Sequence, residues 1–165
     1  MKQSQNFPGG LYSSNWYSGL SPSGEIFFVV RYIGEFVRYD GKVVTEADTL
    51  TDYALEPLVC PYKTIWFDVY KLDFDQKSWI EVECLNDTAL FLGVNQTLAV
   101  SSVEYRELKG NSIYFTDDYW DRMDEDYCYG GHDMGIFSLE DGTIEPLLDC
   151  NQQRFEPSPF WINLS

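Results

Sequence analysis

A single histidine and a dense run of acidic residues are the features of this sequence most able to do chemistry. Because His132 is the only histidine, a zinc site built from several histidines and a relay of paired histidines are both excluded. His132 could act as a base or form the hydrogen bonds of a turn beside Asp133, and the pattern favours the turn. No G-x-S-x-G segment is present, and nothing directs a serine or Cys128 towards His132. We therefore predict no catalytic residue.

The acidic run lies in Asp117–Asp126, where six of ten residues are acidic and one is basic. Its carboxylates do not follow the alternate spacing of an EF-hand loop, and no glycine stands at the sixth position. We therefore predict no metal site, and no motif indicates a cofactor. The segment is typical of an exposed insertion between two strands, where recognition residues often lie. We predict that it contacts a protein partner through Tyr119, Trp120, Arg122, Asp124 and Glu125. The alternative for Tyr119 and Trp120, that their rings fold back onto the blade, stays open.

Composition limits the partners further. The 165 residues include 11 basic and 27 acidic ones, a net charge of −16, which repels nucleic acid and anionic lipid. The charge serves solubility or attracts a basic partner surface. Residues 1–10 lack the apolar core of a signal peptide, and no apolar run approaches the ~18 residues of a membrane span. The four cysteines are scattered, which favours thiols in a reducing compartment, so we expect a cytoplasmic or nuclear protein.

One hairpin pattern occurs twice along the chain. In the first copy an apolar alternation precedes an acidic residue, and the return strand carries Ile-Glu: Tyr70, Leu72, Asp73 and Ile80-Glu81. The second copy has the same order: Phe137, Leu139, Glu140 and Ile144-Glu145. Repeated hairpins of this kind indicate blades of a β-propeller, and propellers bind partners more often than they catalyse reactions.

Strand patterns bounded by turn residues predict an all-β fold. Glu25–Ile33 is largely apolar on both faces, which predicts burial on two sides between neighbouring sheets. In the turn Glu140–Gly142 we expect the glycine to supply a positive φ. Trp66 and Trp79 lie within strand patterns, and we expect both to pack in the core. The other expected strands are Glu35–Asp40, Thr64–Phe74, Lys77–Leu85, Ala89–Leu92, Thr97–Ser102, Ser112–Thr116, Asp133–Leu139 and Thr143–Leu147.

The length is natural for one domain, and 44% apolar and 17% aromatic residues can form a core. Residues 1–24, rich in Ser, Gly, Pro and Asn, are expected to form an irregular N-terminal segment. Residues 25–150 are expected to form the β domain, with insertions near 34–63 and 117–132. Residues 151–165 are expected to form a C-terminal tail.

Five ordered motifs resemble the plant KIB-type β-propeller domain, which forms the C-terminal part of many F-box proteins. They are VYKLD (Val69–Asp73), WIEV (Trp79–Val82), ALFLG (Ala89–Gly93), GNSIYFTDD (Gly110–Asp118) and DMGIFSLEDG (Asp133–Gly142). The earlier Ser23–Arg31 also fits the family's S-x-G-x-L-L-L-V-x-R strand, so the resemblance covers about residues 20–150. It implies a partial β-propeller of about two to three antiparallel, kelch-like blades, since closed propellers need four to eight.

The resemblance also implies a function: a non-enzymatic protein-interaction module that recognises substrates for an SCF-type ubiquitin ligase. The F-box that recruits the Skp1-type subunit is not found in this sequence, so we do not expect that subunit to bind here. Two alternatives stay open, a propeller hydrolase of a polar substrate such as a glycan, with two carboxylates facing one pocket, and a truncated product with no function of its own. A partial ring would expose apolar blade faces, so we expect the isolated chain to be marginally stable or to self-associate.

Overall fold

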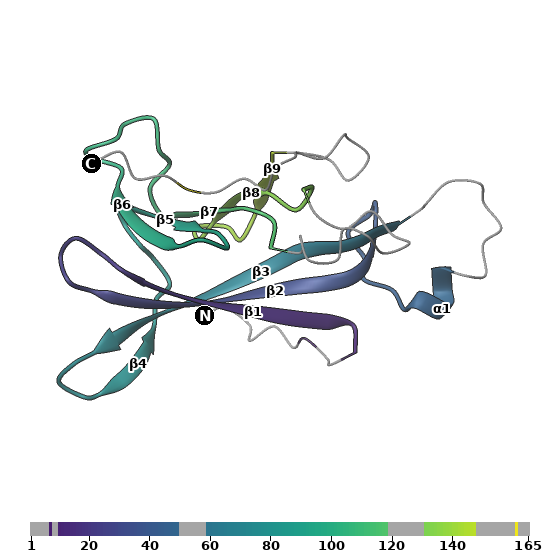
Figure 1. The fold of residues 1–165 in the computed structure, drawn as a ribbon, viewed down its shortest axis with the longest axis horizontal. Coiled ribbons are helices and arrows are strands. Elements are labelled where there is room, and N and C mark those ends of the chain that lie inside the picture. Colours follow the sequence, from purple (N-terminus) through teal and green to yellow (C-terminus); the bar gives the residue numbers. More distant parts are fainter. Residues whose placement is uncertain (1–6, 8–9, 50–58, 119–130, 148–160, 162–165) are drawn as a thin grey trace.

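The computed structural model describes residues 7, 10–49, 59–118, 131–147 and 161. This part of the chain is almost entirely β-structure, with nine strands and one helix of four residues (Figure 1). The elements are β1 (Tyr12–Leu20), β2 (Ile26–Arg38), α1 (Glu46–Thr49), β3 (Val59–Asp73), β4 (Ser78–Glu81), β5 (Thr88–Leu92), β6 (Thr97–Ser101), β7 (Ser112–Phe115), β8 (Gly135–Ser138) and β9 (Ile144–Pro146). No helix in the described ranges is both long and apolar enough to cross a membrane.

The first half of the fold is a four-stranded antiparallel meander in the order β4-β3-β2-β1. Strands β2 and β3 are long, and the register between them shifts at Tyr32/Ile33, which marks a β-bulge. The predicted hairpin between β3 and β4 is confirmed. Its turn closes because the Asp73 carboxylate accepts the backbone N–H groups of Asp75 and Gln76, at 2.8 and 3.0 Å.

The second half has the strand order β6-β5-β7-β8-β9. It contains an antiparallel β5–β6 hairpin and the meander β7-β8-β9, of which β8 and β9 form the predicted last hairpin. Strands β5 and β7 run parallel, which the expectation of antiparallel blades did not include. A long connection between β6 and β7 permits this parallel pairing, because it returns the chain to the far side of β5. In the last turn Gly142 has the expected positive φ, 71°.

The two halves pack face to face. Their strands are joined by a single bridge between Leu20 and Leu98, and the nine-stranded sheet curls so that its halves form two layers (Figure 1). Aromatic rings cross the interface, since the Phe67 ring lies 5.2 Å from both the Phe115 and the Phe137 rings. Burial of each such side chain contributes about 1.5–3 kcal/mol. The core consists of Phe27, Val29, Phe67, Val69, Leu85, Leu90, Leu92, Ala99, Ile113, Phe115, Phe137 and Leu139.

The two-sided burial predicted for Glu25–Ile33 is wrong for this chain. Phe27, Val29 and Ile33 are buried, but the alternate residues Ile26, Phe28 and Val30 are only half-buried. Trp79, also expected in the core, is 48% exposed and lies beside Phe28, with 5.5 Å between ring centroids. The reason is that the described residues place a second layer on one face of this sheet only.

The N-terminal segment also differs from expectation. Residues 1–24 include β1, whose alternate residues are exposed and half-buried. The period of two is obscured because the inward positions include Asn15 and Gly19, whereas the outward positions include the apolar Trp16. The predicted insertion near 34–63 is shorter than expected, since β2 continues to Arg38 and β3 begins at Val59.

Candidate functional site

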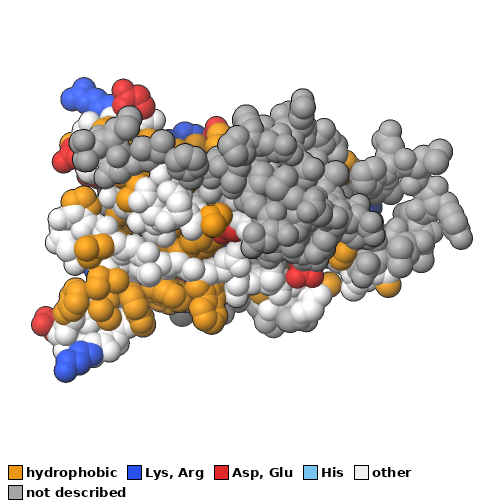
Figure 2. Space-filling model, in the orientation of Figure 1, with side chains coloured by type: hydrophobic (Ala, Val, Ile, Leu, Met, Phe, Trp, Pro, Cys, Tyr) orange, Lys and Arg blue, Asp and Glu red, His pale blue; other side chains and the backbone are white. Residues whose placement is uncertain are grey.

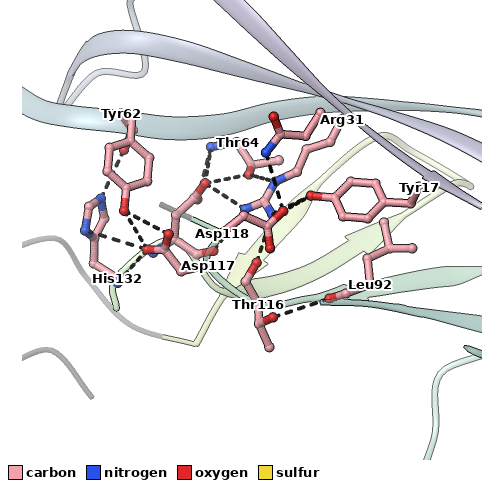
Figure 3. Close-up of polar contacts among 11 residues, drawn as sticks. Tyr17, Arg31, Tyr62, Thr64, Leu92, Thr116, Asp117, Asp118 and His132 are labelled. Carbon is pink, nitrogen blue, oxygen red and sulfur yellow. Dashed lines mark hydrogen bonds and ion pairs between the residues drawn. The ribbon is translucent and has the colours of Figure 1, made fainter. Parts of the chain in front are cut away.

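A buried arginine lies between the two halves of the fold. Arg31 occupies an inward position of β2, and its side chain is fully buried. Its Nη2 donates to the carboxylate of Asp133 at 2.9 Å, its Nη1 donates to Asp118 at 3.2 Å, and its Nε donates to Thr64 Oγ1 at 2.8 Å. Nη1 also donates to the carbonyl oxygen of Thr116 at 2.8 Å. Each guanidinium nitrogen therefore has an acceptor (Figure 3).

The charges of this cluster support one another. Burial alone would lower the pKa of the Arg31 guanidinium, but the Tyr17 oxygen and the Asp133 and Asp118 carboxylates outweigh it and raise that pKa. Tyr17 donates its hydroxyl proton to Asp118 Oδ2. Burial raises the pKa of the Tyr17 phenol; Arg31 opposes the change and Asp118 adds to it. Tyr17 therefore remains a proton donor at neutral pH.

Asp133 connects the arginine to the backbone of β3. Its carboxylate accepts the Thr64 N–H at 2.9 Å and the Thr64 hydroxyl at 2.7 Å, besides the Arg31 contact. The residue is 5% exposed. The carboxylate is occupied by these structural contacts, which leaves it poorly placed to bind a ligand.

A second group of contacts surrounds Asp117, which is fully buried. Its carboxylate accepts the Tyr62 hydroxyl at 2.8 Å and the backbone N–H groups of His132 and Asp133 at 3.0 and 2.9 Å. His132 Nε2 lies 3.1 Å from the carbonyl oxygen of Tyr62. The imidazole of His132 also contacts the phenol ring of Tyr62, with 4.5 Å between ring centroids. His132 is therefore hydrogen-bonded through its backbone and its ring, as predicted, whereas its assignment to a turn stays a prediction.

These contacts join the described residues on either side of positions 119–130. Asp117 and Asp118 precede that segment, and His132 and Asp133 follow it. Because the Asp117 carboxylate binds both following N–H groups, the two ends are fixed side by side on the β-scaffold. We call this cluster the stem network: Tyr17, Arg31, Tyr62, Thr64, Asp117, Asp118, His132 and Asp133. The predicted contact residues Tyr119, Trp120, Arg122, Asp124 and Glu125 lie outside the described residues.

The stem network was not predicted, although the sequence contains a signal for it. Arg31 stands at an inward position of a strand that is otherwise apolar. A charged residue at such a position is rarely buried unless it is paired, so it indicates buried partners. What the strand pattern could not show is which acidic residues those partners are, since Asp133 lies 102 positions away.

A cavity of about 480 Å³ lies beside the stem network. Its wall comes from β1, from the β5–β6 turn and from Asp118, and consists of Ser14, Asn15, Trp16, Tyr17, Gly93, Val94 and Asp118. We call it the β1 pocket. Trp16 is 71% exposed, and the described residues that line the pocket include no lysine or arginine. Asp118, which lines the pocket, directly precedes residues 119–130 in the sequence.

The geometry gives little support to the hydrolase alternative. A glycosidase needs two carboxylates that face one pocket, and Asp118 is the only carboxylate among the described residues that line the β1 pocket. A second cavity, about 290 Å³, has Glu25 and Glu104 in its lining, but Glu25 forms an ion pair with Lys71 at 3.1 Å. No group of three or more metal-ligating side chains occurs among the residues that the structure describes.

Comparison with known proteins identifies the family. The sequence model of the KIB1-4 beta-propeller family matches residues 3–138. The chain belongs to this family. In a β-propeller, four-stranded sheets pack face to face around an axis, and β1–β4 has the four-stranded meander of one such blade, packed against the second half. The all-β, partial-propeller prediction is therefore confirmed.

Curated relatives of this KIB1-4 propeller chain are F-box proteins of Arabidopsis thaliana. Putative F-box protein At3g25750 is 35% identical over 91 residues, 55% of this chain and 23% of the relative. F-box protein At2g17690 is 34% identical over 96 residues, 58% of this chain and 20% of the relative. F-box protein SKIP23 is 30% identical over 147 residues, 87% of this chain and 35% of the relative.

The chain thus spans between about a fifth and a third of the length of these relatives. No solved structure matches it significantly. Propeller family and F-box relatives together indicate a protein-interaction module.

Proposed function

We propose that this KIB1-4 propeller chain is a non-enzymatic module that recognises a protein target through residues 119–130 and the adjoining β1 pocket. The observation that supports this most directly is the stem network, which joins the residues on either side of that acidic and aromatic segment to each other and to the sheet. A binding segment presented from fixed ends loses less conformational entropy on binding than one with unconstrained ends.

Composition of the segment supports the same proposal. Tyr119, Trp120 and Arg122 are of the three residue types most enriched at binding hot spots. The surrounding carboxylates, including Asp124 and Glu125, would attract a basic target surface and speed its association. In contrast, the carboxylates that the structure describes nearby are occupied by structural contacts, Asp117 and Asp133 above all.

A finer role is substrate recognition for an SCF-type ubiquitin ligase in the cytoplasm or nucleus. The relatives named F-box proteins support this role. It is a property of the whole natural gene product, so it is tested by tagging the gene at its own locus in plant tissue. Capture of Skp1-type and cullin subunits together with a target would support it, and their absence beside a captured target would contradict it.

Affinity purification with mass spectrometry from plant tissue tests target recognition. The natural chain is compared with a Tyr119→Ala/Trp120→Ala variant and with a matched control, Glu104→Gln/Glu107→Gln, which changes two exposed acidic residues elsewhere. We expect a set of captured proteins whose recovery is equal with the natural chain and with the control. With the aromatic variant, the recovery of the same proteins should fall at least tenfold. Equal capture by all three chains would overturn the proposal.

A further inference from the structure

Strand β1 has a hydrogen-bonding edge that lacks a partner strand. Its register with β2 runs without a shift from Tyr12 to Leu20, but on its other side it pairs with β6 at one residue, Leu20 (Figure 1). No other strand of the described part of the chain pairs with that side. A row of N–H and C=O groups without a partner strand is a template for pairing with another chain.

Hydrogen bonds just outside the two ends of β1 show which residues form this edge. Before the strand, the Glu35 N–H donates to the Leu11 carbonyl oxygen at 3.0 Å, and after it the Ser21 N–H donates to the Glu25 carbonyl oxygen at 2.9 Å. In an antiparallel ladder such hydrogen-bonded pairs occur at every second residue. The odd-numbered residues of β1 therefore bond to β2. The even-numbered residues direct their N–H and C=O groups away from β2: Tyr12, Ser14, Trp16 and Ser18.

Soluble proteins usually blunt their edge strands, and the two outermost strands of this sheet are blunted. β4 has four residues, and β9 has three and ends at Pro146, which has no N–H to donate. In contrast, β1 has nine residues, YSSNWYSGL, with no charged residue, no proline and no register shift against β2. Ser14, Trp16 and Ser18 are exposed. The edge is therefore accessible to an added strand.

The β1 pocket provides space along this edge. Ser14–Tyr17 line one side of it, and Gly93 and Val94 of the β5–β6 turn line the other, since β1 and β6 stay paired at one position only. On the outer face the Trp16 ring lies 6.3 Å from the Phe28 ring. A residue of an added strand that lies directly opposite Trp16 points to this same face and packs beside the indole. An apolar residue there would cover a side chain that is now largely exposed.

We propose that an extended segment of a protein target adds as a strand to the edge of β1, with backbone hydrogen bonds to Ser14, Trp16 and Ser18 and an apolar residue opposite Trp16. The inference names the form of the recognised segment, so its source in a target rests on the proposed function. Charge favours a target over a second copy of this chain. Each copy has a net charge of −16, which opposes pairing of two copies, whereas a basic segment is attracted.

Amide hydrogen exchange and a titration, both followed by nuclear magnetic resonance of the full chain, test this. In the free chain we expect fast exchange at the amides of Ser14, Trp16 and Ser18, and slow exchange at those of Asn15 and Tyr17. The probe is acetyl-Lys-Thr-Val-Thr-Val-Thr-Lys-amide, which at saturation should slow exchange at the first three amides at least fivefold. A counterpart N-methylated at every residue keeps the side chains but has no backbone donor. It should bind at least tenfold more weakly.

A Ser14→Pro variant tests the edge from the protein side. Proline is tolerated where the N–H of an edge strand faces solvent, so this substitution removes one edge donor and leaves the bonds to β2. It should weaken peptide binding at least fivefold, whereas the matched control Ser14→Ala keeps the N–H and should bind as the natural chain does. Slow exchange at the Asn15 and Tyr17 amides verifies that β1 is intact in both variants. If Ser14→Pro does not fold, the methylated peptide decides the test.

Three results would overturn the proposal: no saturable binding of the probe, equal binding of the methylated peptide, or binding that leaves exchange at the edge amides unchanged. Slow exchange at these amides in the free chain would overturn it too, and a dimeric mass in light scattering would then assign the edge to a second copy. The titration needs no target protein, so its result is independent of whether the affinity purification finds capture that depends on Tyr119 and Trp120.

Discussion

The two faces of the sheet β1–β4 are built from alternate residues of the same strands, yet they differ sharply. Arg31, Val29 and Phe67 of the inner face are buried against the second half of the fold. Trp16, at 71%, and Trp79, at 48%, leave much of the outer face exposed. Figure 2 shows hydrophobic side chains gathered at the surface over the part of the molecule that holds β1 and β4.

The difference teaches that burial in this fold depends on the neighbouring layer and not on the strand alone. Both faces have the apolar period of a buried strand, but only one has a packed partner among the described residues. The outer face of the second half is intermediate, because Trp161 covers Phe91 there with 4.8 Å between ring centroids and donates from its indole to Leu92.

The largest effect is expected from Arg31→Ala on the inner face. Loss of the guanidinium leaves Asp118 and Asp133 as buried carboxylates without a cation, which should lower the free energy of unfolding by about 3–5 kcal/mol. Val30→Ala, one residue away on the half-buried face, should cost about 1 kcal/mol. Urea denaturation measures both. Similar losses for the two variants would contradict the distinction between the faces.

Tyr62→Phe should have the next largest effect. The substitution removes the hydroxyl that donates to Asp117 at 2.8 Å and leaves a fully buried carboxylate with fewer donors. We expect the free energy of unfolding to fall by about 1–3 kcal/mol. Tyr105→Phe, at a half-exposed tyrosine, is the matched control and should change little. If the control costs as much, the Asp117 contact is not the cause.

The free energy of unfolding at alkaline pH should distinguish the two faces through a tyrosine on each. Burial raises the pKa of Tyr17 on the inner face, and burial followed by the hydrogen bond to Asp68 raises the pKa of Tyr32 on the outer face to about 12. In the unfolded chain both phenols lose their protons near the ordinary tyrosine pKa of 10.0, whereas in the folded chain they keep these protons to higher pH. The free energy of unfolding is therefore constant below about pH 10 in this respect and falls as pH rises further.

Urea denaturation between pH 8 and 11 measures that fall. Tyr17→Phe should flatten it more than Tyr32→Phe, because Tyr17 is part of the stem network and more deeply buried. A pH profile that neither substitution changes would show that other groups govern alkaline unfolding.

The smallest effect on stability is expected from Trp79→Ser on the outer face. Since the side chain is about half exposed, the free energy of unfolding should change by about 1 kcal/mol or less. Self-association of the isolated chain should decrease, because a large apolar group leaves the exposed face. Size-exclusion chromatography with light scattering measures the mass of both chains. If the natural chain elutes as a single peak with the mass of a monomer, the expected self-association through this face is contradicted.

The strands themselves were largely predictable from the sequence. The alternation in β3, β5 and β8, with turn residues between the strands, placed most elements within a few residues. Strand β1 was missed because polar or small residues, Asn15 and Gly19, stand at its inward positions and conceal the period of two. For the site, residue type indicated Asp117–Asp126 as a recognition segment, but the predicted contact residues themselves lie outside the described structure and remain predictions.

What the sequence by itself determined is the all-β class, the repeated hairpin and the family, because these depend on local periodicity and ordered motifs. Only the tertiary structure decided which face of each strand is buried and which charges meet. Tyr17 and Asp118 are 101 positions apart, and Arg31 and Asp133 are 102 apart. Contacts across such separations depend on how the two layers stack, and no local pattern records that.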